Sequence, residues 1–290
     1  MPEMPEVQGL VDFLATRTCG LRVSRAAVLA ISALKTFDPP ITALAGSEVV
    51  GADRRGKFVD LSLRSEADEE LHLVFHLAKA GWLRWYDEAP STPVRPGRSP
   101  IAARIVFADG SGFDLTEAGT RKSLAMYVVR APAEVPGIAR LGPDPLDPAF
   151  TRDAFAALLT GRTQIKGLLR DQGVIAGIGN AYSDEILHAA RMSPYAPASG
   201  LSPDDVTRLY DAMQATLREA TAAASGKPPA DLKDAKRRGM QVHGRRGELC
   251  PVCGDTVRSV FFADRSLEYC PTCQTGGKPL ADRRLSRLLK

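Results

Sequence analysis

Apolar residues recur at helical spacing over the first twenty positions of the chain. Val7, Leu10 and Leu14 share one face of a helix, because side chains three and four residues apart lie on the same side. The pattern extends over residues 5–19, and Gly20 is a suitable stop. The sequence therefore predicts an amphipathic helix almost at the start of the chain.

A different pattern follows, in which short β-branched or alternating runs are separated by Gly, Asp and Pro clusters. Such runs are typical of strands. Their close succession favours an antiparallel sandwich or barrel over alternating strand and helix units. We expect strands at residues 21–28, 41–50, 57–63, 71–77, 82–86, 101–107 and 125–129.

Helical periodicity returns in the second half of the chain. Two proline-rich stretches, 87–100 and 131–148, lack any apolar period, and the second suits a domain boundary. Beyond it we expect helices at 150–159, 165–171, 182–191 and 203–224. The pattern predicts an α+β multidomain protein with a β-sandwich domain over 1–140, a helical domain over 141–235 and a small metal-held domain over 236–290.

Four cysteines in the last segment have the spacing of a metal site. They form two C-x-x-C pairs, separated by 16 residues, which is enough for a hairpin of strands at 257–262 and 266–269. Four thiolates converging tetrahedrally favour one structural Zn²⁺. Rubredoxin-type iron is the alternative, but nothing else in the chain resembles an electron carrier. The predicted ligands are Cys250, Cys253, Cys270 and Cys273, and we expect Cys19 to be a core thiol.

The composition narrows the class of protein. The 290 residues are 44% hydrophobic and 25% charged, which is ordinary for globular domains and disfavours a disordered or fibrous protein. No run approaches the roughly 20 apolar residues of a membrane-spanning helix. The acidic N-terminus lacks the basic start of a signal peptide. We therefore expect a soluble cytoplasmic protein without a membrane partner.

Positive charge is concentrated near the end of the chain. Residues 231–290 hold 13 Lys or Arg against 7 Asp or Glu, whereas the other 230 residues hold 25 against 27. A basic segment beside a metal site favours a polyanionic partner such as a nucleic acid. Ordinary solvated surface charge is the alternative explanation.

The first residues contain an unusual chemical group. Removal of Met1 would leave the secondary amine of Pro2 beside the carboxylates of Glu3 and Glu6. An α-amine with a pKa of about 8 is neutral far more often near pH 7.5 than a lysine is. It could attack the anomeric carbon of a sugar, expel a base and leave an iminium ion that promotes elimination of phosphate. The alternative is an ordinary helix N-terminus with proline and acids in its first turn.

Four motifs together resemble one enzyme family. Pro2-Glu3-x-Pro5-Glu6 at the start, Arg55-Gly56-Lys57, the segment 172–185 and the four-cysteine finger occur in one order over essentially the whole chain. This combination is similar to the formamidopyrimidine-DNA glycosylase and endonuclease VIII family of base-excision repair. The resemblance implies a β-sandwich, a helix-two-turns-helix domain and a zinc-finger hairpin that bind damaged DNA as a monomer.

The resemblance also implies roles for five catalytic residues. Pro2 matches the nucleophile, Glu3 matches the general acid and base, and Glu6 matches a second acidic position. Lys57 matches a lysine that contacts the phosphate beside the lesion and assists elimination, with an ordinary surface lysine as the alternative. Arg265 matches the arginine of the finger, which binds the same phosphate region. An ordinary turn arginine is the alternative for Arg265.

Three further residues match positions that contact DNA or lie near the catalytic pocket. His76 matches a phosphate-binding histidine, with a core histidine as the alternative. Asn180 matches a phosphate-gripping residue at a helix start. Glu185 matches a position near the catalytic pocket, with structural capping as the alternative.

The chain departs from the family in the segments expected to enter the space left by a flipped base. Where many members have His-Leu-Gly-Met-Ser-Gly, this chain has Lys79 in place of the methionine. The usual Asp-Pro-Arg-Arg-Phe-Gly loop is missing, which makes Arg121 the candidate intercalating residue without an aromatic wedge. Residues 225–243 lack the lid of the purine-preferring branch, so a purine-specific activity is disfavoured.

The sequence therefore predicts a DNA glycosylase with abasic-site lyase activity that acts through a Pro2 Schiff base and β,δ-elimination. Two alternatives stay open, namely an abasic-site lyase with little glycosylase activity and a non-catalytic zinc-ribbon protein that binds damaged DNA. The preferred lesion, the choice between single-stranded and duplex DNA, and the residues that fill the vacated space are not determined by the sequence.

Overall fold

The computed structural model describes residues 1–92, 99–119, 121–262 and 266–281. The chain forms two compact units, which are described separately. Unit 1 comprises Met1–Arg140 and Ala224–Lys233, and unit 2 comprises Leu141–Ala223 and Asp234–Lys290. The division into three domains at residues 140 and 235 stays a prediction.

Helix α1 (Met4–Thr18) confirms the helix expected at the start of the chain. Pro5 lies in its first turn, where a missing N–H costs nothing. Its apolar face includes Leu10 and Leu14, both fully buried, and burying a leucine side chain contributes about 1.5–3 kcal/mol. Cys19, expected in the core, is exposed, because it lies at the C-terminal cap where the chain leaves the helix.

Eight strands of unit 1 form two four-stranded antiparallel sheets, which confirms the predicted sandwich. The strand orders are β1-β6-β7-β5 and β2-β3-β4-β8. The strands are β1 (Val23–Val28), β2 (Glu48–Arg55), β3 (Phe58–Arg64), β4 (Glu70–His76), β5 (Gly81–Tyr86), β6 (Ile101–Phe107), β7 (Gly112–Glu117) and β8 (Ala125–Val129).

Two details of the strand prediction were wrong. Strand β7 was not predicted, because its short alternating run contains Asp114 between two buried apolar residues. The run expected from residue 41 begins as the 3-10 helix η2 (Ile41–Leu44), and β2 starts only at Glu48. Apolar runs of this length do not distinguish a strand from a short helical turn.

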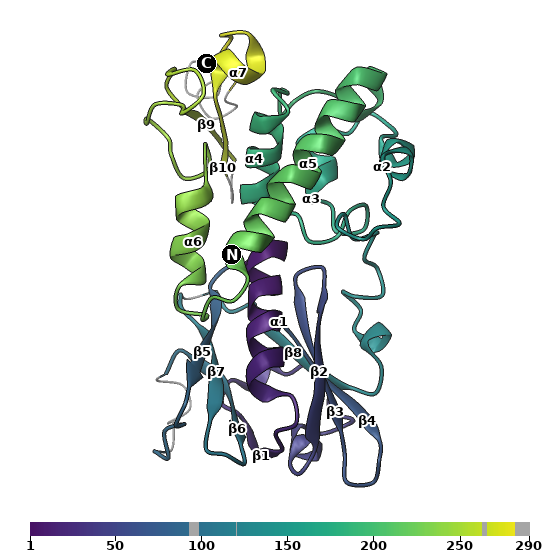
Figure 1. Ribbon diagram of the computed structural model, residues 1–290, viewed down its shortest axis with the longest axis vertical. Helices are drawn as coiled ribbons and strands as arrows, with labels where there is room; N and C mark the ends of the chain where they lie inside the picture. The colour runs from purple at the N-terminus through teal and green to yellow at the C-terminus, as the bar shows by residue number, and fades with distance from the viewer. Residues whose placement is uncertain (93–98, 120, 263–265, 282–290) are drawn as a thin grey trace. The chain divides into compact units, whose positions relative to one another are not determined.

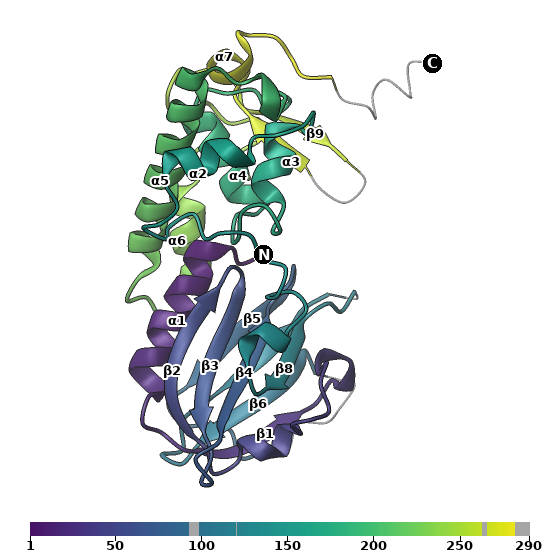
Figure 2. The same ribbon diagram turned by 90° about the vertical axis from the view of Figure 1, so that its right-hand side faces the viewer.

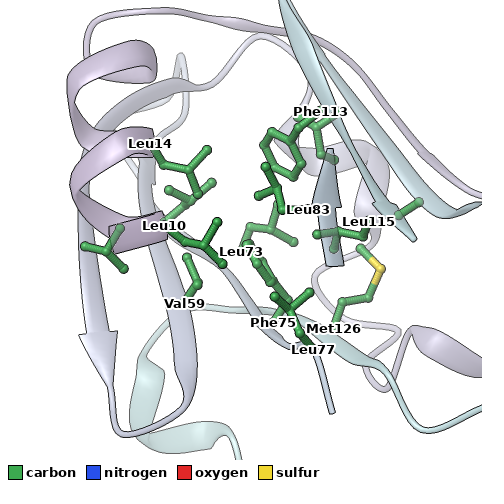
Figure 3. Packing of buried hydrophobic residues seen from close by; sticks show 14 of the residues in the cluster. Leu10, Leu14, Val59, Leu73, Phe75, Leu77, Leu83, Phe113, Leu115 and Met126 are labelled. Carbon is green, nitrogen blue, oxygen red and sulfur yellow. The ribbon is translucent and has the colours of Figure 1, made fainter. Parts of the chain in front are cut away.

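The main core of unit 1 is an apolar cluster between α1 and the sheets. Figure 3 shows Leu10 and Leu14 of α1 directed toward the side chains of the strands, among them Leu73, Leu83 and Phe113. All five side chains are at most 1% exposed. The position of α1 is therefore determined by the packing of its apolar face.

Strand pairing brings three chain segments to one end of unit 1. Phe58, directly after the β2–β3 turn, pairs with His76 at the end of β4. The turn 77–80 then leads to Gly81, which pairs with Glu117 at the end of β7. The loop 118–124 follows, and Ala125 pairs again with His76.

The start of α1 lies at this same end, because α1 runs antiparallel to β2. Gln8 accepts a hydrogen bond from Arg54 Nε, 2.8 Å away, near the end of β2. After the helix, the Gly20 N–H donates to Val49 O near the start of β2. Figures 1 and 2 show the N-terminus and the β2–β3 turn at this end, which we call the turn end of unit 1.

Unit 2 contains the predicted helices and the predicted cysteine hairpin. Two additional helices were not predicted, namely α6, which is short and highly charged, and the five-residue α7. The elements are α2 (Arg152–Leu158), α3 (Ile165–Arg170), α4 (Asn180–Ala189), α5 (Pro203–Ala224), α6 (Leu232–Gly239), β9 (Arg258–Phe261), β10 (Ser266–Tyr269) and α7 (Pro271–Thr275), of which α5 ends and α6 begins in the part of the chain that belongs to unit 1.

A buried ion pair joins β6 and β7 on the side of the sheet opposite the core. Arg104 donates from Nε and Nη2 to the two carboxylate oxygens of Asp114, over 2.7 and 2.8 Å. The side chains of this pair are 7% and 0% exposed. Removing one partner would leave a buried charge without compensation.

We expect Asp114→Asn to lower the free energy of unfolding by about 3–5 kcal/mol, because Arg104 would stay buried without its counter-charge. Urea denaturation measures this change. The exposed pair of Arg130 and Asp38 provides a matched control, and Asp38→Asn should leave the unfolding midpoint unchanged. Equal effects of the two substitutions would contradict the assigned role of the buried pair.

Candidate functional site

The N-terminus places two carboxylates beside the residue expected to carry the reactive amine. Met1 is 46% exposed, whereas Pro2 is buried. Glu3 and Glu6 are each 2% exposed, and the Glu3 N–H donates to Glu6 Oε2 over 2.9 Å. This bond caps the first turn of α1 and fixes Glu6 next to the start of the chain.

Lys57 lies in the two-residue turn between β2 and β3. Arg55 pairs with Phe58, so Gly56 and Lys57 form the whole turn. Gly56 has φ of 57°, a left-handed conformation that glycine adopts without strain at the first position of such a turn. Lys57 is only 8% exposed, so its side chain is held by the fold.

His76 at the end of β4 is a neutral hydrogen-bond donor at neutral pH. Its ring lies against Phe58, with centroids 4.8 Å apart. Burial, and then the positive charge of Lys57, lower the pKa of His76 to about 4. The Ala78 N–H donates to Nδ1 over 3.2 Å, so the proton of the neutral ring is on Nε2.

Lys79 and Arg121 are both exposed and belong to the turn end of unit 1. Lys79 lies in the turn 77–80, and Arg121 lies in the loop 118–124. The structure therefore brings seven of the predicted residues to one end of one unit. They are Pro2, Glu3, Glu6, Lys57, His76, Lys79 and Arg121.

Asn180 begins helix α4 in unit 2 and contacts the finger. Its Nδ2 donates to Ser266 O over 2.8 Å. The turn before it is held by Gln172, which donates to Ile178 O over 2.7 Å and accepts from the Gly177 N–H over 2.9 Å. Asn180 thus anchors the first residue of β10, next to the hairpin tip. Arg265 lies outside the described residues.

Glu185 binds the backbone that leads into the finger. Its carboxylate accepts the N–H groups of Gln241, Val242 and His243 over 2.7, 3.0 and 2.8 Å. Burial raises the pKa of Glu185, and these three hydrogen bonds oppose that effect. The geometry favours the structural alternative for Glu185, and a DNA contact stays a prediction.

The four cysteine sulfurs converge as a metal site requires. All four Sγ atoms lie within 4.8 Å of one another, and two pairs, Cys253–Cys270 and Cys250–Cys273, are separated by 3.3 and 3.9 Å. Tetrahedral zinc–thiolate bonds of about 2.3 Å give sulfur separations of about 3.8 Å. Burial raises the pKa of Cys270 to about 11, which disfavours its thiolate. A bound divalent cation stabilises the thiolate and removes this penalty. The site fits one structural Zn²⁺.

Sequence reasoning missed two groups of residues that support this region. His188 Nε2 lies 3.3 Å from Cys250 Sγ, and such contacts orient metal ligands. Lys166 donates to Ser183 Oγ and Asp184 Oδ1 over 2.7 and 2.6 Å, and Asp184 Oδ2 lies 2.8 Å from His243 Nδ1. No local pattern of the sequence identifies these contacts, because they join residues 17 or more positions apart.

The comparisons with known proteins cover all three regions of the chain. The family model of the formamidopyrimidine-DNA glycosylase N-terminal domain matches residues 1–126, and that of the H2TH domain of the same enzyme matches residues 141–228. The model of the zinc finger found in FPG and IleRS matches residues 247–276. The last match supports zinc at the four cysteines.

Whole-length relatives agree with these matches. Formamidopyrimidine-DNA glycosylases of Symbiobacterium thermophilum and Moorella thermoacetica are 34% and 37% identical to this chain, over 98% and 90% of it and 93% and 94% of their own lengths. An uncharacterized glycosylase-like protein of Mycobacterium tuberculosis is 57% identical over 54% of this chain and 99% of its own.

Solved structures share the fold. The MutM (Fpg) protein of Thermus thermophilus is 29% identical, with a TM-score of 0.78 over 96% of this chain and 100% of that one. The Fpg of Lactococcus lactis, at 23% identity, has a TM-score of 0.81 over 94% of this chain and 99% of that one. Together, the fold, the finger and the relatives define a DNA glycosylase of base-excision repair. The chain belongs to the formamidopyrimidine-DNA glycosylase family.

Among the described residues, no helix is long and apolar enough to cross a bilayer.

We expect the purified protein to contain about one zinc per chain, and Cys253→Ser to lose it, because three thiolates do not close a tetrahedral structural site. Metal analysis measures the content, and limited proteolysis of the finger reports its folding. Cys19→Ser is the control and should retain the metal. Iron in the wild-type protein, or full zinc retention in Cys253→Ser, would contradict the assignment.

The depressed pKa of His76 predicts a pH dependence of stability. The unfolded ring has a pKa of about 6.5, so the neutral folded ring contributes fully above that pH and loses its contribution as the pH falls toward 4. The loss amounts to about 3 kcal/mol. Urea denaturation of the wild type and His76→Gln between pH 7.5 and 4.5 should show their difference changing by this amount. A constant difference would refute the assigned environment.

Proposed function

We propose that this chain excises damaged bases from DNA and cleaves the resulting abasic site, with the amine of Pro2 as the nucleophile. The observation that carries the proposal is the turn end of unit 1. There, the residue that becomes the N-terminus adjoins two buried carboxylates, and Lys57 and His76 belong to the same end. No other residue type in the chain offers an amine with so low an ordinary pKa.

The chemistry assigns one role to each group. The Pro2 nitrogen attacks C1′ of the deoxyribose, the bond from C1′ to the base breaks, and the base leaves with a proton. Opening of the sugar ring gives an iminium ion between Pro2 and C1′. Loss of a C2′ proton then expels the 3′ phosphate, and a second elimination expels the 5′ phosphate. Glu3 delivers and removes the protons, and Glu6 holds the terminus.

Phosphate contacts are proposed for four residues. Lys57 supplies a positive charge and His76 a neutral N–H donor from unit 1. Asn180, and Arg265 beside the residue that Asn180 anchors, act from unit 2. Relatives support DNA as the partner, since Lactococcus lactis Fpg was solved with DNA that contains an abasic site and with DNA that contains Fapy-dG. The proposed place of action is chromosomal DNA in the cytoplasm.

A second candidate is an abasic-site lyase with little glycosylase activity. Lys79 favours it, because a lysine replaces the methionine that many family members carry in the turn 77–80. Both candidates use the same amine. They differ only in whether the base must be removed by this protein.

Borohydride reduction tests the nucleophile. It should couple the wild-type protein covalently to DNA with an abasic site, because it reduces the iminium to a stable amine. We expect Pro2→Gln to couple at less than about one hundredth of the wild-type yield, because retained Met1 displaces the terminal amine by one residue from Glu3 and Glu6. Mass spectrometry of both proteins establishes whether Met1 is present.

Glu3→Gln is the matched control in the same segment. It should still couple to a preformed abasic site, while its release of a damaged base slows about 10²–10⁴-fold. Undiminished coupling by Pro2→Gln would refute the assigned nucleophile. Binding of damaged DNA without coupling or cleavage by the wild type would favour the non-catalytic alternative.

A further inference from the structure

The turn 77–80 and the loop 118–124 form one connected surface at the turn end of unit 1. Gly81 pairs with Glu117, and the Ala118 N–H donates to Ala80 O over 3.2 Å. A strand pair and a backbone hydrogen bond thus join the two segments. This surface carries Lys79 and Arg121, and the inference below about their role rests on the proposed function.

The conformation of the turn leaves Lys79 at its exposed apex. The Gly81 N–H donates to Leu77 O over 2.8 Å, and a Cβ at Gly81 would lie 2.1 Å from that oxygen. Ala78 has φ of 50°, which strains a residue with a side chain. Leu77 and Ala78 are 2% and 8% exposed. The turn is thus closed by a backbone hydrogen bond over buried apolar residues, and its exposed charged residue is Lys79.

The loop is anchored in a comparable way. The Glu117 carboxylate, on a residue 3% exposed, accepts the N–H groups of Ser123 and Leu124 over 2.7 and 2.9 Å. Lys122 Nζ donates to Glu117 O, so this lysine folds back onto the loop. Leu124 is 2% exposed. Arg121, the residue before Lys122, is exposed.

This surface is cationic and has, among its described residues, no exposed apolar side chain that could act as a wedge between bases. Neither segment contains an aromatic residue, and the large aliphatic residues, Leu77 and Leu124, are both buried. Proteins that open a base step in duplex DNA insert apolar side chains between the bases. A strongly hydrated ammonium does not replace the stacking lost there, since burying it in an apolar space is costly.

Unpaired DNA removes that requirement. Extruding a base from a duplex costs a few kcal/mol, and the cost is least where the base is already unpaired. Cations in contact with an unpaired strand bind its phosphates, and a guanidinium can also stack on an exposed base. We propose that Lys79 and Arg121 make this protein selective for damaged bases in DNA that is already unpaired, as in a single strand or a bubble.

Single-turnover base excision on matched oligonucleotides tests this selectivity. The same oxidised pyrimidine is placed in a single strand, in a bubble and in a fully paired duplex. The wild type should act about tenfold faster on the single strand and the bubble than on the duplex. Lys79→Met restores an apolar apex and should reduce this preference about fivefold, mainly by raising the rate on the duplex. Arg121→Gln should slow excision from the single strand.

Lys35→Met is the matched control. Lys35 is an exposed lysine of the same unit on a different loop, so its replacement removes the same charge and should leave the preference unchanged. A duplex rate equal to or above the single-strand rate in the wild type would overturn the proposal. An equal shift in Lys35→Met and Lys79→Met would also overturn it, because net charge alone would then explain the effect.

Borohydride coupling to an abasic site in a single strand separates this proposal from the proposed function. Coupling by every variant together with equal excision from all three substrates would refute only the selectivity. Absence of coupling and of excision in the wild type would refute the proposed function and the selectivity with it. Thermal unfolding midpoints of the variants verify that each is folded.

Discussion

Burial of the apolar face of α1 is the constraint on which the proposed chemistry depends. A terminal amine is ordinarily the most mobile group of a chain, and a nucleophile must be held within a few tenths of an ångström of its productive position. Here Pro2 precedes by two residues a helix whose Leu10 and Leu14 are fully buried against both sheets. The core of the sandwich thereby immobilises the start of the chain.

Strand register performs the corresponding task for the residues around the amine. A slip of one residue between β3 and β4 would move His76 to the opposite face of the sheet and away from Phe58. The neutrality of His76 follows from this packing, because the ring is buried beside Lys57. The positive charge of this pair is therefore on Lys57. His76 stays neutral near neutral pH and can donate a hydrogen bond from Nε2 to an anion.

In unit 2, one helix organises the finger through several side chains. Asn180, Asp184 and His188 recur every fourth residue along α4, and each reaches the finger or the segment before it. Glu185 adds three hydrogen bonds to the backbone at residues 241–243. Zinc closes the finger internally, and α4 anchors its base. The apolar periodicity of the sequence does not predict a polar face of this kind on a buried helix.

Much of this architecture could be predicted from the sequence. The helix at the start, the paired cysteines and most strands have local signatures, namely a repeat of 3.6 or 2 residues or a fixed ligand spacing. Strand β7 was not predicted, because the burial of Asp114 depends on its ion pair with Arg104, ten residues away. The backbone N–H groups that Glu185 binds were not predicted for the same reason, because they lie more than fifty residues from it in the sequence. Local patterns do not record such pairings.

The same distinction applies to the candidate site, for which the sequence proposes residues but gives no geometry. The resemblance to a family assigns Lys79 and Arg121 to segments that enter DNA, but it does not reveal that these segments are joined by the bond from Ala118 to Ala80. Because they are joined, Lys79 and Arg121 belong to one surface. An exposed cationic surface without a wedge binds backbone phosphates better than it fills a gap between stacked bases. Selection among DNA structures can therefore arise here from the missing apolar wedge as much as from the cations Lys79 and Arg121.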